Sequence, residues 1–183
     1  MFARHVCMVL AICAGILAVS AGAARGQVAR EYSIKAAFLY NLAKFTEWPK
    51  GTDGGAFSVC VVGEDPFGQD LDTIAATKTV GDQTLAVHRF RSPEHITACR
   101  ILFVSRSEAH RLDAILARTG RSATLLVGDT EGFAENGIMI NFYVDQDKIR
   151  FEINETAVTE ANLKISSKLL RIARIVGADK EGR

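Results

Sequence analysis

The chain lacks an excess of charge of either sign. Its 183 residues contain 22 Lys and Arg side chains against 21 Asp and Glu side chains, a formal net charge of +1. A nucleic-acid-binding domain is expected to carry a clear excess of basic residues, because it has to neutralise phosphates. The balance therefore argues against a nucleic-acid-binding protein.

The chain also lacks a second long apolar run and the short signatures of common enzymes. Beyond the N-terminal region no apolar run reaches the roughly 20 residues that a membrane-spanning helix needs. The patterns G-x-G-x-x-G, G-x-x-x-x-G-K-S/T and G-x-S-x-G are absent, which excludes the usual nucleotide loops and a nucleophile elbow. His95 and Cys99 are four residues apart, as metal ligands on a helix can be, but they have too few companions. We predict no catalytic site, no cofactor and no metal.

The first 24 residues have the pattern of a signal peptide. Arg4 and His5 precede an apolar run over residues 6–19, and small residues follow over 20–24. We predict an exported protein, with a signal peptide over residues 1–24 and one domain over residues 25–183. Cleavage would remove only Arg4 from the charged residues, so that 21 basic and 21 acidic side chains remain.

Processing would leave two cysteines out of four, because Cys7 and Cys13 lie within the signal peptide. In an exported protein the remaining pair, Cys60 and Cys99, most simply forms one disulfide. Closing a loop of about 40 residues would stabilise the fold by roughly 3 to 4 kcal/mol.

The stretch from Glu31 to Pro49 has the periodicity of an amphipathic helix that ends at the proline. Lys35 and Lys44 are expected on its solvent side. Trp48, the only tryptophan, is expected either to cover the core or to stand exposed. The predicted core-facing side chains are Ile34, Phe38, Leu42 and Phe45.

Beyond this helix, short apolar segments alternate with helical ones. This alternation predicts a single three-layer Rossmann-like α/β domain, with a mainly parallel sheet and an antiparallel hairpin at one edge. Helices are expected near residues 67–76 and 107–118, the second capped by Ser107 and ended by Gly120. The predicted strands cover residues 57–62, 85–90, 100–105, 123–127, 138–144 and 148–153.

Several polar residues follow the predicted strands, where open α/β folds bind their ligands. They are Glu64, Asp65, Ser105, Arg106, Asp129 and Glu131. A phosphoacceptor site or a metal site is one interpretation, but no acidic residue follows the strand over 100–105. Solvated turn residues are the other.

The C-terminal region carries a basic stripe at helical spacing, formed by Lys164, Lys168, Arg171 and Arg174. We predict an amphipathic helix there. Its basic face is either solvated or a docking surface for an acidic partner or an anionic ligand.

Four segments together resemble the YfiR family of exported bacterial proteins. They are KAAFLYNLAKFTEWP (35–49), VVGEDPFG (61–68), LLVGDTEGFAENGIMINFYVDQDKIRFEIN (125–154) and LKISSKLLRIARIV (163–176). The resemblance implies a periplasmic, non-enzymatic repressor that binds the periplasmic sensor domain of an inner-membrane diguanylate cyclase. Release of that cyclase would raise cyclic di-GMP and promote biofilm formation. Well-studied members of the family carry two disulfides, whereas this chain offers one cysteine pair after processing.

Two functions follow from these observations. The first is an interaction module, expected as a homodimer, that inhibits a membrane diguanylate cyclase through a surface containing Tyr40, Lys44 and Trp48. The second is a periplasmic receptor for a small molecule, or an accessory protein of another membrane sensor such as a histidine kinase. The residues expected to hold a small anionic ligand are Arg171, Arg174, Glu64 and Asp129.

Overall fold

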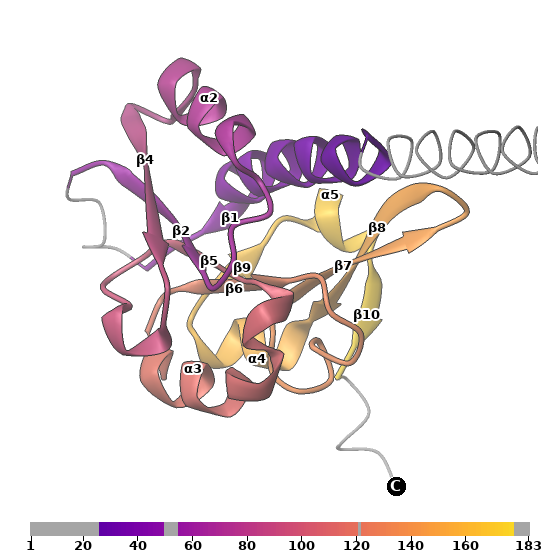
Figure 1. The fold of residues 1–183 in the computed structure, drawn as a ribbon. Helices are drawn as coiled ribbons and strands as arrows, with labels where there is room; N and C mark the ends of the chain where they lie inside the picture. Colours follow the sequence, from indigo (N-terminus) through magenta and orange to yellow (C-terminus); the bar gives the residue numbers. More distant parts are fainter. Residues whose placement is uncertain (1–25, 50–54, 121, 178–183) are drawn as a thin grey trace, which may run out of the picture.

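The computed structural model describes residues 26–49, 55–120 and 122–177, so the predicted signal peptide lies outside the described residues. Its centre is an eight-stranded sheet in the order β10-β8-β7-β6-β5-β2-β4-β3. The N-terminal helix, described over residues 26–45, lies on one side of this sheet, and α3 (Leu112–Thr119) and α4 (Glu155–Glu160) lie on the other (Figure 1). The predicted three-layer α/β class is confirmed.

The sheet is mainly parallel, as predicted. Parallel pairs join β2 to β4 and β5, β5 to β6, β6 to β7, and β10 to β8, whereas β7–β8 and β3–β4 are antiparallel. The predicted hairpin is therefore present, with β10 added outside it. The strand bounds are β2 (Phe57–Val62), β3 (Thr79–Val80), β4 (Gln83–Phe90), β5 (Ile101–Val104), β6 (Leu125–Gly128), β7 (Ile140–Asp145), β8 (Lys148–Asn154) and β10 (Arg174–Val176).

The helices follow the predicted order, with one difference in capping. The α2 helix (Gln69–Thr77) lies within one or two residues of its predicted bounds, and Gly120 is the residue that ends α3, as expected. Ser107 is not a cap: it lies in a 3-10 segment, Arg106–Arg111, and its hydroxyl accepts the backbone N–H of Glu64. None of the described helices has both the length and the apolar character needed to cross a membrane.

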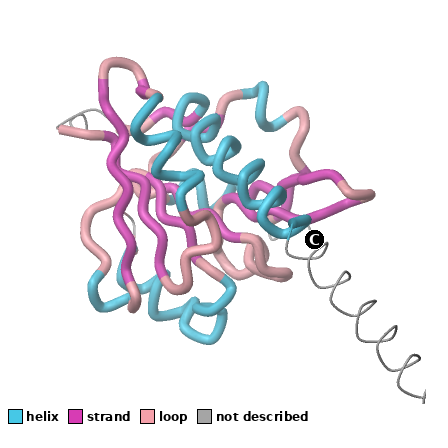
Figure 2. Tube along the Cα trace, turned by 45° about the horizontal axis from the view of Figure 1, so that its top comes forward, coloured by secondary structure: helices cyan, strands magenta, loops and turns pink. Residues whose placement is uncertain are grey.

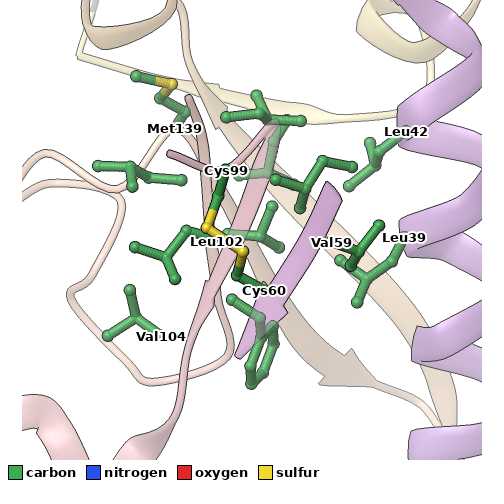
Figure 3. Packing of buried hydrophobic residues seen from close by; sticks show 14 of the residues in the cluster. Leu39, Leu42, Val59, Cys60, Cys99, Leu102, Val104 and Met139 are labelled. Atoms are coloured by element: carbon green, nitrogen blue, oxygen red, sulfur yellow. A yellow bond between two sulfur atoms is a disulfide. The ribbon is translucent and has the colours of Figure 1, made fainter. Parts of the chain in front are cut away.

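The core lies on both faces of the parallel strands. Leu39 and Leu42 of the N-terminal helix approach Val59 on one face, and the Cys60–Cys99 disulfide lies on the opposite face (Figure 3). The predicted disulfide is present and ties β2 to the segment before β5, with its two Cα atoms 6.1 Å apart. All of β5 and β6 is buried, which accounts for their uninterrupted apolar sequences.

The side of the N-terminal helix that faces the core only partly matches the predicted one: Leu42 is buried, and Phe38 and Phe45 pack against the core from its margin. The side chain of Lys35, expected on the surface, is buried, while Ile34 is 41% exposed and Phe38 is half-buried. The helix also ends at residue 45, before the proline, because Thr46–Glu47 (β1) pairs with Lys164–Ile165 (β9). The buried apolar side chains are Ala36, Leu39, Leu42 and Ala43.

The prediction of a C-terminal amphipathic helix is wrong. The segment forms β9, a single helical turn α5 (Ser167–Leu170) and β10. The backbone groups of β10 complete the open edge of β8, and this pairing outweighs a helical periodicity. The basic stripe is consequently divided between three elements instead of sharing one helix face.

Candidate functional site

A cavity of about 520 Å³ lies where β6 ends, between the N-terminal helix and the β7–β8 hairpin. It is lined by one side of the helix, the loop after β6, and parts of β7, β8 and β10. The hairpin extends beyond the body of the sheet, beside the start of the described part of the helix (Figure 2). The position matches the expectation that an open α/β fold binds ligands beyond the carboxyl ends of its strands.

The inner wall of the cavity contains a buried ion pair between the helix and the sheet. Lys35 Nζ is 2.7 Å from Asp129 Oδ2 and 2.5 Å from Glu31 Oε1. The exposed fractions of the Lys35 and Asp129 side chains are 3% and 1%. Because both charges are removed from water, each depends on the other for compensation.

Tyr32 completes this charged cluster. Its hydroxyl donates a hydrogen bond of 2.7 Å to Asp129 Oδ2, and Lys35 Nζ lies 4.4 Å from the centre of its ring. Burial, and then the hydrogen bond to Asp129, raise the pKa of Tyr32 above its ordinary value. The phenol therefore stays protonated and holds the Asp129 carboxylate in place.

A second buried carboxylate lies on the hairpin side of the cavity. Glu152 of β8 is 3% exposed and forms an ion pair with Arg174 of β10. Asn141 of β7 donates from Nδ2 to Glu152 Oε2 at 3.3 Å and to the carbonyl of Thr130 at 3.0 Å. The Arg174 guanidinium lies 4.7 Å from the ring centre of Tyr143. These contacts fix the positions of the polar groups on β7, β8 and β10.

Two acceptor atoms of residues that line the cavity lack partners. Asp129 Oδ1 and Asn141 Oδ1 are buried and accept no hydrogen bond from any described residue. Buried polar atoms of this kind normally find a partner, and one left unsatisfied costs about 1 to 3 kcal/mol. The wall therefore has hydrogen-bonding capacity that the fold does not use.

The structure brings together part of the predicted ligand set. Asp129 and Arg174 line the cavity, as do Arg106 and Glu131 from the residues after the strands. Glu64 and Arg171 are exposed and do not line it. Of the remaining residues after the strands, Ser105 is buried, and Asp65 forms an ion pair of 2.6 Å with Arg89.

Two of the predicted partner-binding residues, Tyr40 and Lys44, lie toward the far end of the same helix, and Trp48 lies beyond its end. Lys44 is exposed and lies 5.5 Å from the ring centre of Tyr40, whose hydroxyl donates to the carbonyl of Thr79. Trp48 is half-buried, with its ring 5.2 Å from that of Phe57 in an edge-to-face arrangement. Trp48 is therefore part of the packing, and Tyr40 and Lys44 are the accessible members of the set.

The site contains residues that were not predicted, among them Tyr32, Lys35, Asn141 and Glu152. The last two had a detectable signal, because each occupies a strand position flanked by buried apolar residues, where a polar side chain is unusual. Lys35 and Tyr32 had none, since a lysine on an apolar helix normally marks the solvent side.

A second cavity, of about 720 Å³, lies at the opposite edge of the sheet near the disulfide. Its charged lining residues are Arg100 and Arg118, and the structure uses both in packing. Arg100 lies 5.7 Å from the ring centre of Trp48, and Arg118 donates to the carbonyl of Ile96. Within the described residues this edge has no cluster comparable to that around Asp129, and no group of three or more His, Cys, Asp or Glu side chains is placed to hold a metal.

The described residues form an α/β domain with a charged cavity at the carboxyl end of β6. Comparison with known families then identifies it: residues 32–174 match the YfiR/HmsC-like family, and the chain belongs to that family. In general terms, that family comprises periplasmic regulators of cyclic di-GMP signalling that act with a membrane signalling partner. The family is one of regulators and not of catalysts.

Other comparisons give distant similarities. No curated protein matches the chain. One similar structure is the ABC domain of Streptococcus pneumonia in complex with L-Trp, with 11% identity, a TM-score of 0.48, and coverage of 65% of this chain and 55% of that one. Another is a conserved domain protein from Vibrio cholerae O1 biovar El Tor, with 13% identity, a TM-score of 0.49, and coverage of 65% and 54%. The chain thus spans about half the length of each, and neither similarity indicates a function.

Proposed function

We propose that the protein inhibits an inner-membrane diguanylate cyclase by binding its periplasmic sensor domain. The observation that carries the proposal is the family match over residues 32–174. The disulfide fits an oxidising compartment, and residues 1–24 would direct export and be removed. The protein acts as a homodimer in this proposal, and the outcome of inhibition is low cyclic di-GMP and reduced biofilm formation.

The contact surface proposed for the cyclase includes Tyr40 and Lys44, with Trp48 at its edge. Tyr40 and Lys44 are accessible on the N-terminal helix, and neither forms part of the buried ion pair. A half-exposed tyrosine offers apolar area together with a polar group, which is typical of residues that dominate interfaces. Charge at Lys44 would act mainly on the rate of association.

The proposal is tested by deletion. Removing the gene should raise cyclic di-GMP, and the rise should disappear when the partner cyclase is deleted as well. Complementation with the Tyr40→Ala/Lys44→Glu variant should fail to restore repression although the variant is exported and folded. Asp113→Lys, on the exposed side of α3, is the matched control and should repress normally. Unchanged cyclic di-GMP after deletion, with the protein abundant in the wild type, would contradict the proposal.

A second candidate function is favoured by the cavity. A periplasmic receptor needs an enclosed site with a few fixed polar groups, and the walls around Asp129 and Asn141 supply them. This function is compatible with the first, because a bound ligand could modulate the inhibitor. It also applies to an accessory protein of another sensor, such as a histidine kinase. A pull-down from membranes would show which sensor the protein binds.

A further inference from the structure

The cavity beside the Lys35–Asp129 ion pair has a negative balance of charge. Five of its lining side chains are carboxylates and three are cationic, a formal excess of two negative charges. A concave site lined by an excess of one sign raises the local concentration of ions of the opposite sign. Charge therefore favours a cationic ligand over the anionic one that the basic C-terminal stripe suggests.

The cations in the wall are largely neutralised within the protein. Lys35 is paired with both Asp129 and Glu31, and Arg174 is paired with Glu152. Among the described residues, Arg106 is the cationic lining residue without an ion pair. An anion entering the cavity would have to compete with carboxylates already in contact with these two cations.

The unsatisfied hydrogen-bonding atoms near the cavity are also compatible with a cationic ligand. Asp129 Oδ1 and Asn141 Oδ1 are acceptors, and both residues are more than nine-tenths buried. Glu131 and Glu135 add exposed carboxylates to the lining, and neither forms an ion pair with a described residue. The missing partner is thus a hydrogen-bond donor, and the excess of carboxylates favours a donor with positive charge, as a primary ammonium is. A metal ion fits less well, because no described cluster of His, Cys, Asp and Glu has the necessary arrangement.

We propose that this cavity binds a small organic cation of the aliphatic polyamine class. One primary ammonium donates hydrogen bonds to Asp129 Oδ1 and Asn141 Oδ1, and the other positive end faces Glu131 and Glu135. The volume of about 520 Å³ is ample for a short polyamine. The inference names the ligand class of the receptor function and rests on that second candidate. It is independent of the identity of the membrane partner.

The position of the binding site also suggests how a bound ligand would affect the surface proposed for the partner. Asp129 Oδ2 holds Lys35 and Tyr32 of the N-terminal helix, so a cation on Oδ1 of the same carboxylate alters the charge balance of the contact that fixes that helix. The helix carries Tyr40 and Lys44 farther along. Occupancy of the cavity is thereby coupled to the surface proposed for the partner.

The test uses three probes with the same four-carbon chain and different charge, measured by titration calorimetry on the purified native protein. The probes are 1,4-diaminobutane, 1,4-butanediol and succinate. We expect the diamine to bind at one site per chain, more weakly as salt rises, and the diol and the dicarboxylate to give no saturable signal. A thermal shift that grows with diamine concentration gives an independent measure of the same equilibrium.

Variants then locate the site without disturbing the buried pair. The Glu131→Gln/Glu135→Gln variant removes two exposed charges and should weaken diamine binding by about fivefold to tenfold, as two partly screened charges would. The Glu160→Gln variant removes one exposed charge on α4, outside the cavity, and should bind as the wild type does. Circular dichroism should show both variants folded.

Each other result overturns the inference. Saturable binding of succinate would make the cavity an anion site. No binding of any probe would mean that water alone satisfies the two acceptors, and equal diamine affinity in the Glu131→Gln/Glu135→Gln variant would place the cation elsewhere. Because these measurements use the isolated protein, they can fail while inhibition of the cyclase holds, and the deletion experiment can fail while they succeed.

Discussion

The stability of the protein should depend on Lys35 far more than on any other lysine of the N-terminal helix. Lys35→Met keeps the length and apolar stem of the side chain and removes only its charge. Asp129 would then be a carboxylate that is 1% exposed, with Tyr32 as its remaining hydrogen-bond donor. Removing one partner of a buried ion pair typically costs about 3 to 5 kcal/mol of unfolding free energy.

Replacing the acidic partner of the pair should cost less unfolding free energy, because Lys35 has a second carboxylate partner and Asp129 has no second cationic partner among the described residues. After Asp129→Asn, Lys35 keeps Glu31, whose carboxylate lies 2.5 Å away and is 27% exposed. We therefore expect a loss of about 1 to 3 kcal/mol, close to the loss of one charged hydrogen bond. The double variant should lose less than the sum of the two, with a coupling energy of about 1 to 3 kcal/mol.

Urea denaturation followed by circular dichroism measures all four corners of this cycle. Lys44→Met, on the exposed side of the same helix, is the matched control and should change the unfolding free energy by less than about 0.5 kcal/mol. If Lys35→Met cost no more than Lys44→Met, or if the coupling energy were near zero, the buried pair would not be what holds the helix on the sheet.

Three further predictions concern other parts of the fold. Replacing both Cys60 and Cys99 with alanine should lower the unfolding free energy by about 2 to 5 kcal/mol, and thiol labelling of the unfolded, unreduced wild type should detect neither cysteine. Trp48→Ala should cost about 2 kcal/mol in urea denaturation, because the ring packs on Phe57, and a loss of partner binding without this cost would contradict that packing. Because folding raises the pKa of Tyr32, its hydrogen bond to Asp129 stabilises the folded state below about pH 10, and this stabilisation is lost as the pH rises further. The difference in unfolding free energy between wild type and Tyr32→Phe should therefore narrow in alkaline urea titrations. A difference that stayed constant would refute the hydrogen bond.

The centre of the sheet was predictable because its strands are buried on both faces. In β5 and β6 every residue is apolar or glycine and every one is buried, so a short apolar run between helical segments indicates a central strand directly. The cysteine pair was predictable by elimination, since only two cysteines follow the predicted signal peptide. Both arguments use information that lies within one segment or in a simple count.

The C-terminal segment was not predictable in the same way. Its basic residues recur at helical spacing, but β10 forms because β8 would otherwise present an open edge. That edge is created by a hairpin about twenty residues earlier in the chain. The local sequence pattern favours a helix, but the need to pair the open edge of β8 favours a strand, and the pattern gives no information about that edge.

Part of the candidate site could be predicted from the sequence, and the Lys35–Asp129 ion pair shows why the rest could not. Asp129 could be placed from its position after a strand, because the carboxyl ends of parallel strands meet at one edge. Lys35 could not, because whether a lysine is buried depends on what the helix meets 94 residues later in the chain. The error in the core-facing side of the helix has the same origin. With Lys35 directed at Asp129, the buried side passes through Ala36, Leu39, Leu42 and Ala43, and Ile34 is turned toward solvent.

A buried ion pair of this kind contributes more to the placement of the helix than to net stability. Leu39 and Leu42 could pack on an apolar sheet in several rotations, since apolar contacts are not directional. Lys35 favours one rotation, because any other would leave the Asp129 carboxylate buried without its cation. That rotation determines which side chains remain on the surface, Tyr40 and Lys44 among them, and which line the cavity. The surface proposed for the partner and the cavity proposed for a cation are thus set by one contact, so a change at Asp129 should affect both.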